Sequence, residues 1–495
     1  LFSARRSYID VALDVAGIAD AGIIGYPRTL DFTNKFVYDL TPRNKLTFTA
    51  LNFFETFNQT DAQAQNIDRR TDRFRMRRTS QRHILGTTLS TTINAKTLAQ
   101  TTVWHNIAHN DGMFYLPYTS VLQRQRNLRD SQTGVKEDVS WMPDQKVRLS
   151  FGGALQIDGV NYYTFERAGN LYSPLEEEYV APTRQYRFRL SNSTSGNLYA
   201  QAVVNVTNRF SITPGIRLDH YGLTGETLAS PRFAARFNAS NTVALTFATG
   251  IYRQPPSAFQ FSLTPLNQDL KTQSATHIIG GVEWMVREDT RIRVEAFRKS
   301  YSDLVVQQVG PTPAFVSNGR YFNSGSGTAS GFEVSVHRAL TGFLTGQASY
   351  GYVISDRKLT AGGLEMPSDL ERPHQLTLIG ITSFKGFNIA AKYRIASGLP
   401  YTRRTAITVA AGTFIQRIAS ASDINALRLP NFASFDLRAE RRFAFKRVSI
   451  SPYIDIFNLT NYRSVVQPSY EFNRRTPRML GEDKRLPIFG FRFEF

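Results

Sequence analysis

Apolar and polar side chains alternate at every second position through much of this chain. Residues 243–251 show the pattern, with small or polar residues between the apolar members of one face, Val243, Leu245, Phe247 and Ile251. Successive side chains of a β-strand point to opposite faces of its sheet. The alternation therefore predicts strands that each carry one continuous apolar face.

Charged residues occupy the alternate positions of some of these strands. Arg291, Arg293 and Glu295 are separated by Ile292 and Val294. In a soluble sandwich the polar face meets water and the apolar face packs on a second sheet. In an outer-membrane barrel the apolar face meets lipid and the polar face lines a wet lumen. The alternation alone leaves both architectures open.

The lengths of the connections favour the barrel. Long polar segments alternate with short turns, which are residues 41–46, 93–98, 142–147, 206–211, 238–243, 286–291, 338–343, 383–387 and 442–447. The long segments are residues 58–78, 112–130, 167–195, 255–272, 305–326, 355–371, 401–430 and 463–485. Short turns at one end and long loops at the other are typical of transmembrane barrels, with the turns in the periplasm.

The strands are expected to be roughly 9–15 residues long, enough for a tilted crossing that needs about 9–11. About twenty are expected by the same reading of the alternation. The first are residues 1–12, 31–40, 45–57 and 79–94, and the last are residues 431–443, 446–459 and 486–495. The predicted fold is thus an all-β, antiparallel transmembrane barrel that spans residues 1–495 as one domain.

Composition narrows the function classes. The chain has no cysteine, which excludes disulfides, thiolate metal sites and cysteine catalysis. Its net charge of +19 suggests nucleic acid, but no DNA- or RNA-binding motif accompanies the charge. No catalytic or nucleotide-binding motif is present, so we predict no enzyme and no cofactor. A soluble β-propeller would need equal, repeated blades, whereas the loops here are unequal.

The chain resembles the barrel of TonB-dependent outer-membrane receptors over essentially the whole length of the chain. Ten stretches carry this resemblance, and they follow one another in the family's order. They include "TPGIRLDHY" (213–221), "FNSGSGTASGFEVSV" (322–336), "ERPHQLTLIG" (371–380) and "ASGLPYT" (396–402). The resemblance implies the outer membrane of a Gram-negative bacterium. It also implies TonB-dependent uptake of a scarce nutrient such as a ferric siderophore. The alternative is a plugless barrel that acts as a pore or as a structural or secretion component.

The family also has an N-terminal plug domain inside its barrel, through which TonB acts. Residues 1–10 lack the order of a signal peptide and already have the pattern of a strand. By resemblance they correspond to the third strand of a 22-stranded barrel. The plug and about two strands are therefore expected to be absent from this sequence, and TonB would act only through that plug.

A run of arginines is the candidate ligand site. Arginine binds phosphate and carboxylate bidentately, so the run is expected to capture an anionic ligand or to contact lipopolysaccharide phosphates, if it is not simply a solvated rim. Its members, in a loop expected at residues 68–83, are Arg69, Arg70, Arg73, Arg75, Arg77, Arg78 and Arg82. His105 and His109 lie too far apart on a strand to form a metal pair, so no metal site is predicted.

The last residues alternate phenylalanine with small or charged residues. Phe489, Phe491, Phe493 and Phe495 are expected to face lipid, while the residues between them face the lumen. By resemblance, Phe491, Phe493 and Phe495 form the signal that the barrel assembly machinery reads. The expected partners are therefore that machinery, outer-membrane lipid and lipopolysaccharide, and no nucleic acid.

Overall fold

The computed structural model describes most of the chain. The residues described are 1–7, 26–59, 75–115, 121–167, 183–307, 320–338, 344–360, 363–410, 413–417, 420–446, 448–469, 478–482 and 485–494. Among these residues, no helix is long and apolar enough to cross a membrane.

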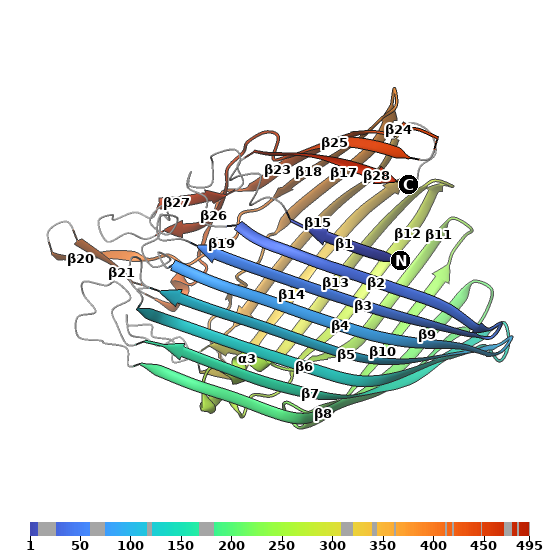
Figure 1. The fold of residues 1–495 in the computed structure, drawn as a ribbon, viewed down its shortest axis with the longest axis horizontal. Coiled ribbons are helices and arrows are strands. Elements are labelled where there is room, and N and C mark those ends of the chain that lie inside the picture. Colours follow the sequence, from blue (N-terminus) through green and yellow to red (C-terminus); the bar gives the residue numbers. More distant parts are fainter. Residues whose placement is uncertain are drawn as a thin grey trace.

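One antiparallel sheet of 22 strands dominates the described part of the chain. Figure 1 shows its tilted strands side by side, curled into the wall of a barrel. The strands of this sheet are β1 (Phe2–Arg6), β2 (Tyr26–Thr41), β3 (Asn44–Gln59), β4 (Arg75–Asn94), β5 (Thr97–Tyr115), β6 (Leu122–Trp141), β7 (Val147–Glu166), β8 (Arg184–Asn205), β9 (Phe210–Tyr221), β10 (Glu226–Asn238), β11 (Val243–Gln254), β12 (Gln273–Arg287), β13 (Thr290–Gln307), β14 (Tyr321–Arg338), β15 (Leu344–Lys358), β16 (Met366–Pro367), β17 (His374–Phe384), β18 (Phe387–Ala396), β23 (Phe432–Arg441), β24 (Phe443–Ala444), β25 (Ser449–Phe457) and β28 (Leu486–Glu494).

The remaining elements are short and lie in the connections. They are α3 (Ala258–Phe261), η2 (Pro265–Asn267), η3 (Ala421–Asp423) and the paired strands β19 (Pro400–Tyr401) with β22 (Leu427–Arg428), β20 (Thr405–Ala410) with β21 (Thr413–Arg417), and β26 (Ser464–Ser469) with β27 (Arg478–Glu482).

The expected number of strands is confirmed. β16 pairs with the end of β15, whose remainder pairs with β17, so β16 and β17 share one position in the wall. β24 likewise continues β23 along β25. Taking these two short strands out of the 22 leaves 20 positions around the barrel within the described residues. The edge strands of this sheet are β1, which pairs with β2, and β28, which pairs with β25.

The sorting of connections is also confirmed. The expected short turns that the structure describes join neighbouring strands at one end of the barrel, which we call the turn end, whereas residues 339–343 lie outside the described residues. The longer connections lie at the opposite end, which we call the loop end. The connections between β5 and β6 (residues 116–121) and between β9 and β10 (residues 222–225) are short exceptions there.

Some strands are longer than predicted. β4, β6 and β7 each have 20 residues and β8 has 22, whereas the alternation predicted at most about 15. Much of residues 112–130 and all of residues 184–195, expected as loops, therefore belong to strands, as do residues 58–59 and 75–78 at the ends of another expected loop. β9 and β11 have only 12 residues each, so the wall is much taller on the β4–β8 side.

The two faces of the sheet separate as predicted. Neighbouring strands place Val282, Val294 and Val334 in one cross-strand row, while Glu283 and Arg293 form the next row on the opposite face. The valine row is on the outer face, which would meet lipid. The charged row faces the lumen, where cross-strand and same-strand ion pairs form, such as Arg236–Glu283 at 3.0 Å. Each luminal charge of such a pair therefore meets an opposite charge rather than lipid.

The last strand follows the same rule. Phe489, Phe491 and Phe493 are 72%, 67% and 54% exposed on the outer face of β28. Arg492 faces inward and lies 3.3 Å from Glu440 on β23. The expected faces of these residues are confirmed, and Phe495 lies outside the described residues.

A matched pair of arginine substitutions tests the assignment of faces. Val294→Arg places a charge near the middle of the outer apolar band and is expected to lower the free energy of unfolding by about 2–4 kcal/mol, because the charge enters lipid. Ser349→Arg, on the luminal face of β15 in the row that contains Arg293 and Ser335, is expected to cost less than about 1 kcal/mol. Denaturant unfolding of the protein folded into lipid vesicles measures both changes, and equal losses would contradict the assignment.

Candidate functional site

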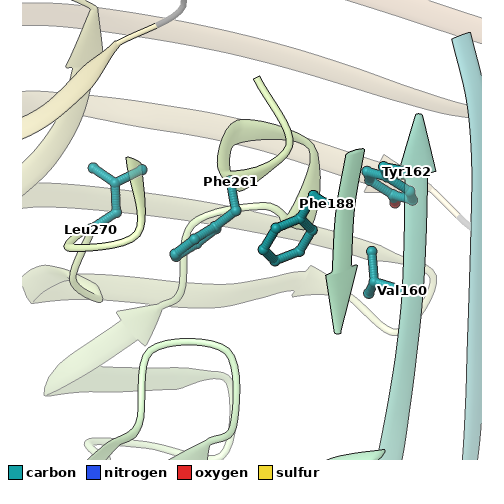
Figure 2. Packing of buried hydrophobic residues seen from close by; sticks show 5 residues of the cluster. All are labelled: Val160, Tyr162, Phe188, Phe261 and Leu270. Carbon is teal, nitrogen blue, oxygen red and sulfur yellow. The ribbon is translucent and has the colours of Figure 1, made fainter. Parts of the chain in front are cut away.

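Residues 255–272, which we call the inner loop, fold back against the luminal wall at the loop end. The loop begins at Pro255-Pro256, where β11 has ended, and it contains α3 and η2. Phe261 and Leu270 of the loop are buried in one apolar cluster with Val160, Tyr162 and Phe188 of the wall. Figure 2 shows this packing, with Tyr162 and Val160 on one strand and Phe188 on its neighbour. The apolar cluster therefore fixes the inner loop to β7 and β8.

Hydrogen bonds hold the inner loop from the other sides. Ser257 and Gln260 form a reciprocal cap at the start of α3. Asn267 is fully buried, donates through Nδ2 to the Gln260 carbonyl at 2.7 Å and accepts from the Tyr321 backbone N–H at 2.9 Å. The Thr272 backbone N–H donates to Glu226 at 2.7 Å. Since buried polar groups are satisfied on every side, the inner loop is a fixed part of the wall.

A pocket of about 500 Å³, the luminal pocket, opens between the inner loop and the wall. The inner loop contributes Pro255 and Ala258 to it, and Tyr221 comes from the end of β9. The wall contributes mostly polar side chains from β4 to β9. Its charged and polar lining residues include Arg82, Asn106, Asp130, Gln132, Gln156, Asp158, Ser193, Ser195, Asn197, Arg217 and Asp219.

The acidic side chains of the luminal pocket already have partners. Tyr162 donates its hydroxyl to Asp130 at 2.5 Å, and Ser195 donates to Asp158 at 2.8 Å. Arg217 donates to Asp219 at 2.8 Å, and this pair forms along one strand, β9. The luminal pocket therefore presents hydroxyl, amide and carboxylate groups that are held in place.

Arg82 differs from these charges. Its side chain is exposed on the luminal face and interacts with the Asp130 carboxylate only through longer-range electrostatics, without a hydrogen bond or ion pair within the described part of the chain. Arg78, four residues earlier on β4, also faces the lumen but is paired with Glu55 at 3.2 Å. Among the charged groups that line the luminal pocket, Arg82 is therefore the one available to a ligand as the described contacts stand.

The structure separates the predicted arginine run. Arg75, Arg77, Arg78 and Arg82 lie on β4 and not in a loop, which corrects the expected secondary structure. Alternate positions send Arg78 and Arg82 to the lumen and Arg75 and Arg77 to the outer face, where Arg75 lies over the Tyr115 ring at 4.7 Å. The other members, Arg69, Arg70 and Arg73, lie outside the described residues, as do the remaining positions of residues 68–74.

The histidines form no metal site. His105 hydrogen-bonds Thr133 at 2.7 Å, and His109 contacts Asn127 at 3.2 Å. Within the described ranges, no group of three or more His, Asp or Glu side chains is arranged to hold a metal ion.

A second polar cluster, the loop latch, joins residues 363–373 to residues 397–431 at the loop end. Its central ion pair is Arg428–Glu371, and Glu371 is only 5% exposed. Asn425 donates to Asp369 at 2.7 Å and to the Pro367 carbonyl at 2.9 Å. A buried carboxylate needs such a partner, so the loop latch fixes the two segments to each other.

Gly398 lets the loop latch close. A Cβ atom placed on it would lie 1.7 Å from the Leu429 carbonyl oxygen, so Gly398→Ala must push β19 and β22 apart. We expect backbone amide exchange around residues 399–402 and 425–429 to become at least tenfold faster, because about 1.4 kcal/mol of local stability corresponds to that factor. Hydrogen-exchange mass spectrometry measures it.

Gly280→Ala is the control for this change, because nothing lies within 4 Å of the Cβ that it adds. Exchange that stays slow in Gly398→Ala would show that the loop latch tolerates separation of its strands.

Comparison with known proteins identifies a family and several solved structures with the same fold. The family described as "TonB dependent receptor-like, beta-barrel" matches residues 18–459. The ferric-catecholate import receptor Fiu of Escherichia coli K12 superimposes with a TM-score of 0.66 at 12% identity, over 94% of this chain and 74% of that one. The siderophore receptor PiuA of Acinetobacter baumannii gives 0.68 at 11% identity, over 95% and 74%.

The ferripyoverdine receptor of the Pseudomonas aeruginosa outer membrane gives a TM-score of 0.69 at 12% identity. This similarity covers 99% of the present chain and 66% of that receptor. A comparison with curated proteins finds no match. At identities this low, the structural similarity establishes the barrel fold and not the ligand.

Proposed function

Because this chain belongs to the TonB-dependent receptor β-barrel family, we propose that it is the barrel of a receptor that takes up a ferric siderophore across the outer membrane. The family places the chain in that membrane, and its solved relatives are receptors and transporters, so we also propose that it is not an enzyme. In the family, TonB acts on a plug domain inside the barrel, and we propose the same route of coupling here.

The luminal pocket carries the proposal. It lies at the loop end, which faces the cell exterior, and the inner loop and the wall fix it in shape. Its hydroxyl, amide and carboxylate groups suit a ligand rich in oxygen and amide groups, and polar groups of this kind orient a ligand in a concave site. A volume of about 500 Å³ holds part of a siderophore, whose remainder would project toward the lumen.

The ligands in the names of three solved relatives agree with this chemistry. The relatives are described as binding or importing a ferric catecholate, a siderophore and ferripyoverdine. Arg82 supplies the unpaired positive charge that an anionic ferric chelate needs. These observations favour a ferric siderophore over a neutral nutrient.

We also propose that the end of the chain serves barrel assembly. The outer face of β28 presents Phe491 and Phe493 in a row, and Phe495 continues the same alternation in the sequence. This row would be the surface that the barrel assembly machinery recognises.

Uptake under iron limitation tests the substrate. Deleting the gene is expected to reduce uptake of at least one ⁵⁵Fe-labelled chelate about tenfold or more among catecholates, hydroxamates and citrate. The same loss is expected in a strain without TonB, because transport depends on its energy. Unchanged iron uptake in the deletion strain would contradict the siderophore proposal. Uptake that persists in the strain without TonB would favour a passive pore.

A substitution at Arg82 tests the pocket itself. Arg82→Gln is expected to raise the Kd of the transported chelate about tenfold, since one charge-assisted hydrogen bond contributes roughly 1.5–3 kcal/mol. Arg78→Gln is the matched control, because Arg78 lies on the same face of β4 but is paired with Glu55 outside the pocket. Binding to the purified receptor, measured by quenching of tryptophan fluorescence, should separate the two variants, and equal effects would place the ligand elsewhere.

A further inference from the structure

Three arginines lie on the outer face of the tall side of the barrel. Arg129 on β6 and Arg189 on β8 flank Asn161 of β7 in one cross-strand row, and Arg187 lies one pleat farther along β8. Neighbouring strands are about 4.8 Å apart, so the Cα atoms of Arg129 and Arg189 are separated by about 10 Å. All three arginines are exposed. We call Arg129, Arg187 and Arg189 the outer arginine patch.

The outer arginine patch has no opposing carboxylate. None of its three guanidinium groups makes a hydrogen bond or ion pair in the part of the chain that the structure describes, and Arg187 only lies over the Tyr163 ring at 5.4 Å. The outward carboxylate of Asp111 on β5 accepts a hydrogen bond from Asn127 at 3.3 Å. Many luminal arginines, in contrast, are paired with Asp or Glu, as in Arg217–Asp219. The patch therefore presents an unneutralised positive charge on the face that points away from the pocket.

The patch lies at the height along the barrel where the lipid headgroups of the outer leaflet are expected. Ile157 is 49% exposed and is the last large apolar residue on the outer face of β7 before Asn161. Asn161 lies four residues farther toward the loop end, which is about 13 Å along the strand and less along the membrane normal because strands tilt. The arginines consequently lie just above the apolar band, at the level of the outer-leaflet headgroups.

An apolar groove continues below the patch on the same outer face. Its volume is about 530 Å³, and its walls include Val135, Leu155, Leu198 and Leu218. Gly153 lines the groove between Leu155 and Leu198 and leaves room because it has no side chain. At the lower end, Glu137 accepts a hydrogen bond from Thr101 at 2.6 Å, so its carboxylate is already bonded. Leu155 lies six residues below Asn161, about 20 Å along the strand, which is within reach of an acyl chain.

We propose that this face binds the lipid A part of lipopolysaccharide, with its phosphate held by the outer arginine patch and an acyl chain in the groove. Guanidinium groups bind phosphate bidentately, and the interface lowers the solvation that would weaken such a pair. The apolar groove adds burial of hydrocarbon at about 25 cal/mol per Å². The site lies on the opposite face from the luminal pocket and does not depend on which nutrient is transported.

Binding of fluorescent diphosphoryl lipid A to the purified receptor in detergent micelles tests the proposal. The triple variant R129Q/R187Q/R189Q is expected to bind at least tenfold more weakly than the wild type, and R129K/R187K/R189K is expected to lose less, because an ammonium still pairs with phosphate. The matched control is Arg298→Gln on β13, a single exposed outward arginine outside the patch. Its binding should equal that of the wild type.

A second measurement needs no variant. The wild-type receptor is expected to prefer diphosphoryl over dephosphorylated lipid A by about tenfold, and rising salt should reduce this preference. Equal binding of the two lipids, or a folded triple glutamine variant that binds like the wild type, would falsify the proposal. The same result would leave the patch as a contact for a protein partner.

Discussion

Every backbone N–H and C=O group that crosses the hydrocarbon layer must find its partner on a neighbouring strand, because no water is there to replace it. The unbroken series of antiparallel pairings from β1 to β28 meets this demand for all the strands between these two edge strands. Strand geometry then gives each side chain one of two destinations, lipid or lumen. The row Val282–Val294–Val334 and the luminal pair Arg236–Glu283 are consequences of that single constraint.

Within this wall, the candidate site depends on a loop that is not free to move. The inner loop is fixed by Phe261 in the apolar cluster and by the fully buried Asn267. Because the inner loop is already ordered, little conformational entropy is lost from this loop when a ligand enters the luminal pocket. The carboxylates there are bonded to Tyr162, Ser195 and Arg217, and Arg82 is left to meet the ligand. The candidate site is therefore built from the wall as much as from the loops.

The alternation of side chains predicted the strands and the faces of β28, because both depend on a local period of two. The lengths of the connections predicted the barrel and its turn end. The extra length of β8 was missed for a local reason as well. At the Asp158/Val160 irregularity of β7 and β8, Asn192 takes a left-handed conformation with φ of 56°, and the extra residue shifts the alternation of β8. Tyr186 and Phe188 therefore face the lumen, out of phase with the outward-facing Leu198 farther along the strand, and residues 184–195 were assigned to a loop.

The luminal pocket could not be predicted from the sequence, because it joins Arg82 to Asp130 and Arg217 through the curvature of the wall. The sequence pointed to part of the loop latch, since Glu371 and Gly398 fall within residues 371–380 and 396–402, which resemble the receptor family. Their contacts with Arg428 and Leu429 depend on tertiary structure and could not be predicted. Their role is structural: they hold neighbouring loops at the rim.

The unequal height of the wall has a consequence for whatever approaches the cell. β8 has 22 residues and β9 has 12, so the rim rises by about 30 Å along the strand direction between them, at roughly 3.3 Å per residue. The rim at the loop end is therefore oblique to the barrel axis. Within the described residues, a large molecule that approaches the loop end would therefore meet the β4–β8 side first.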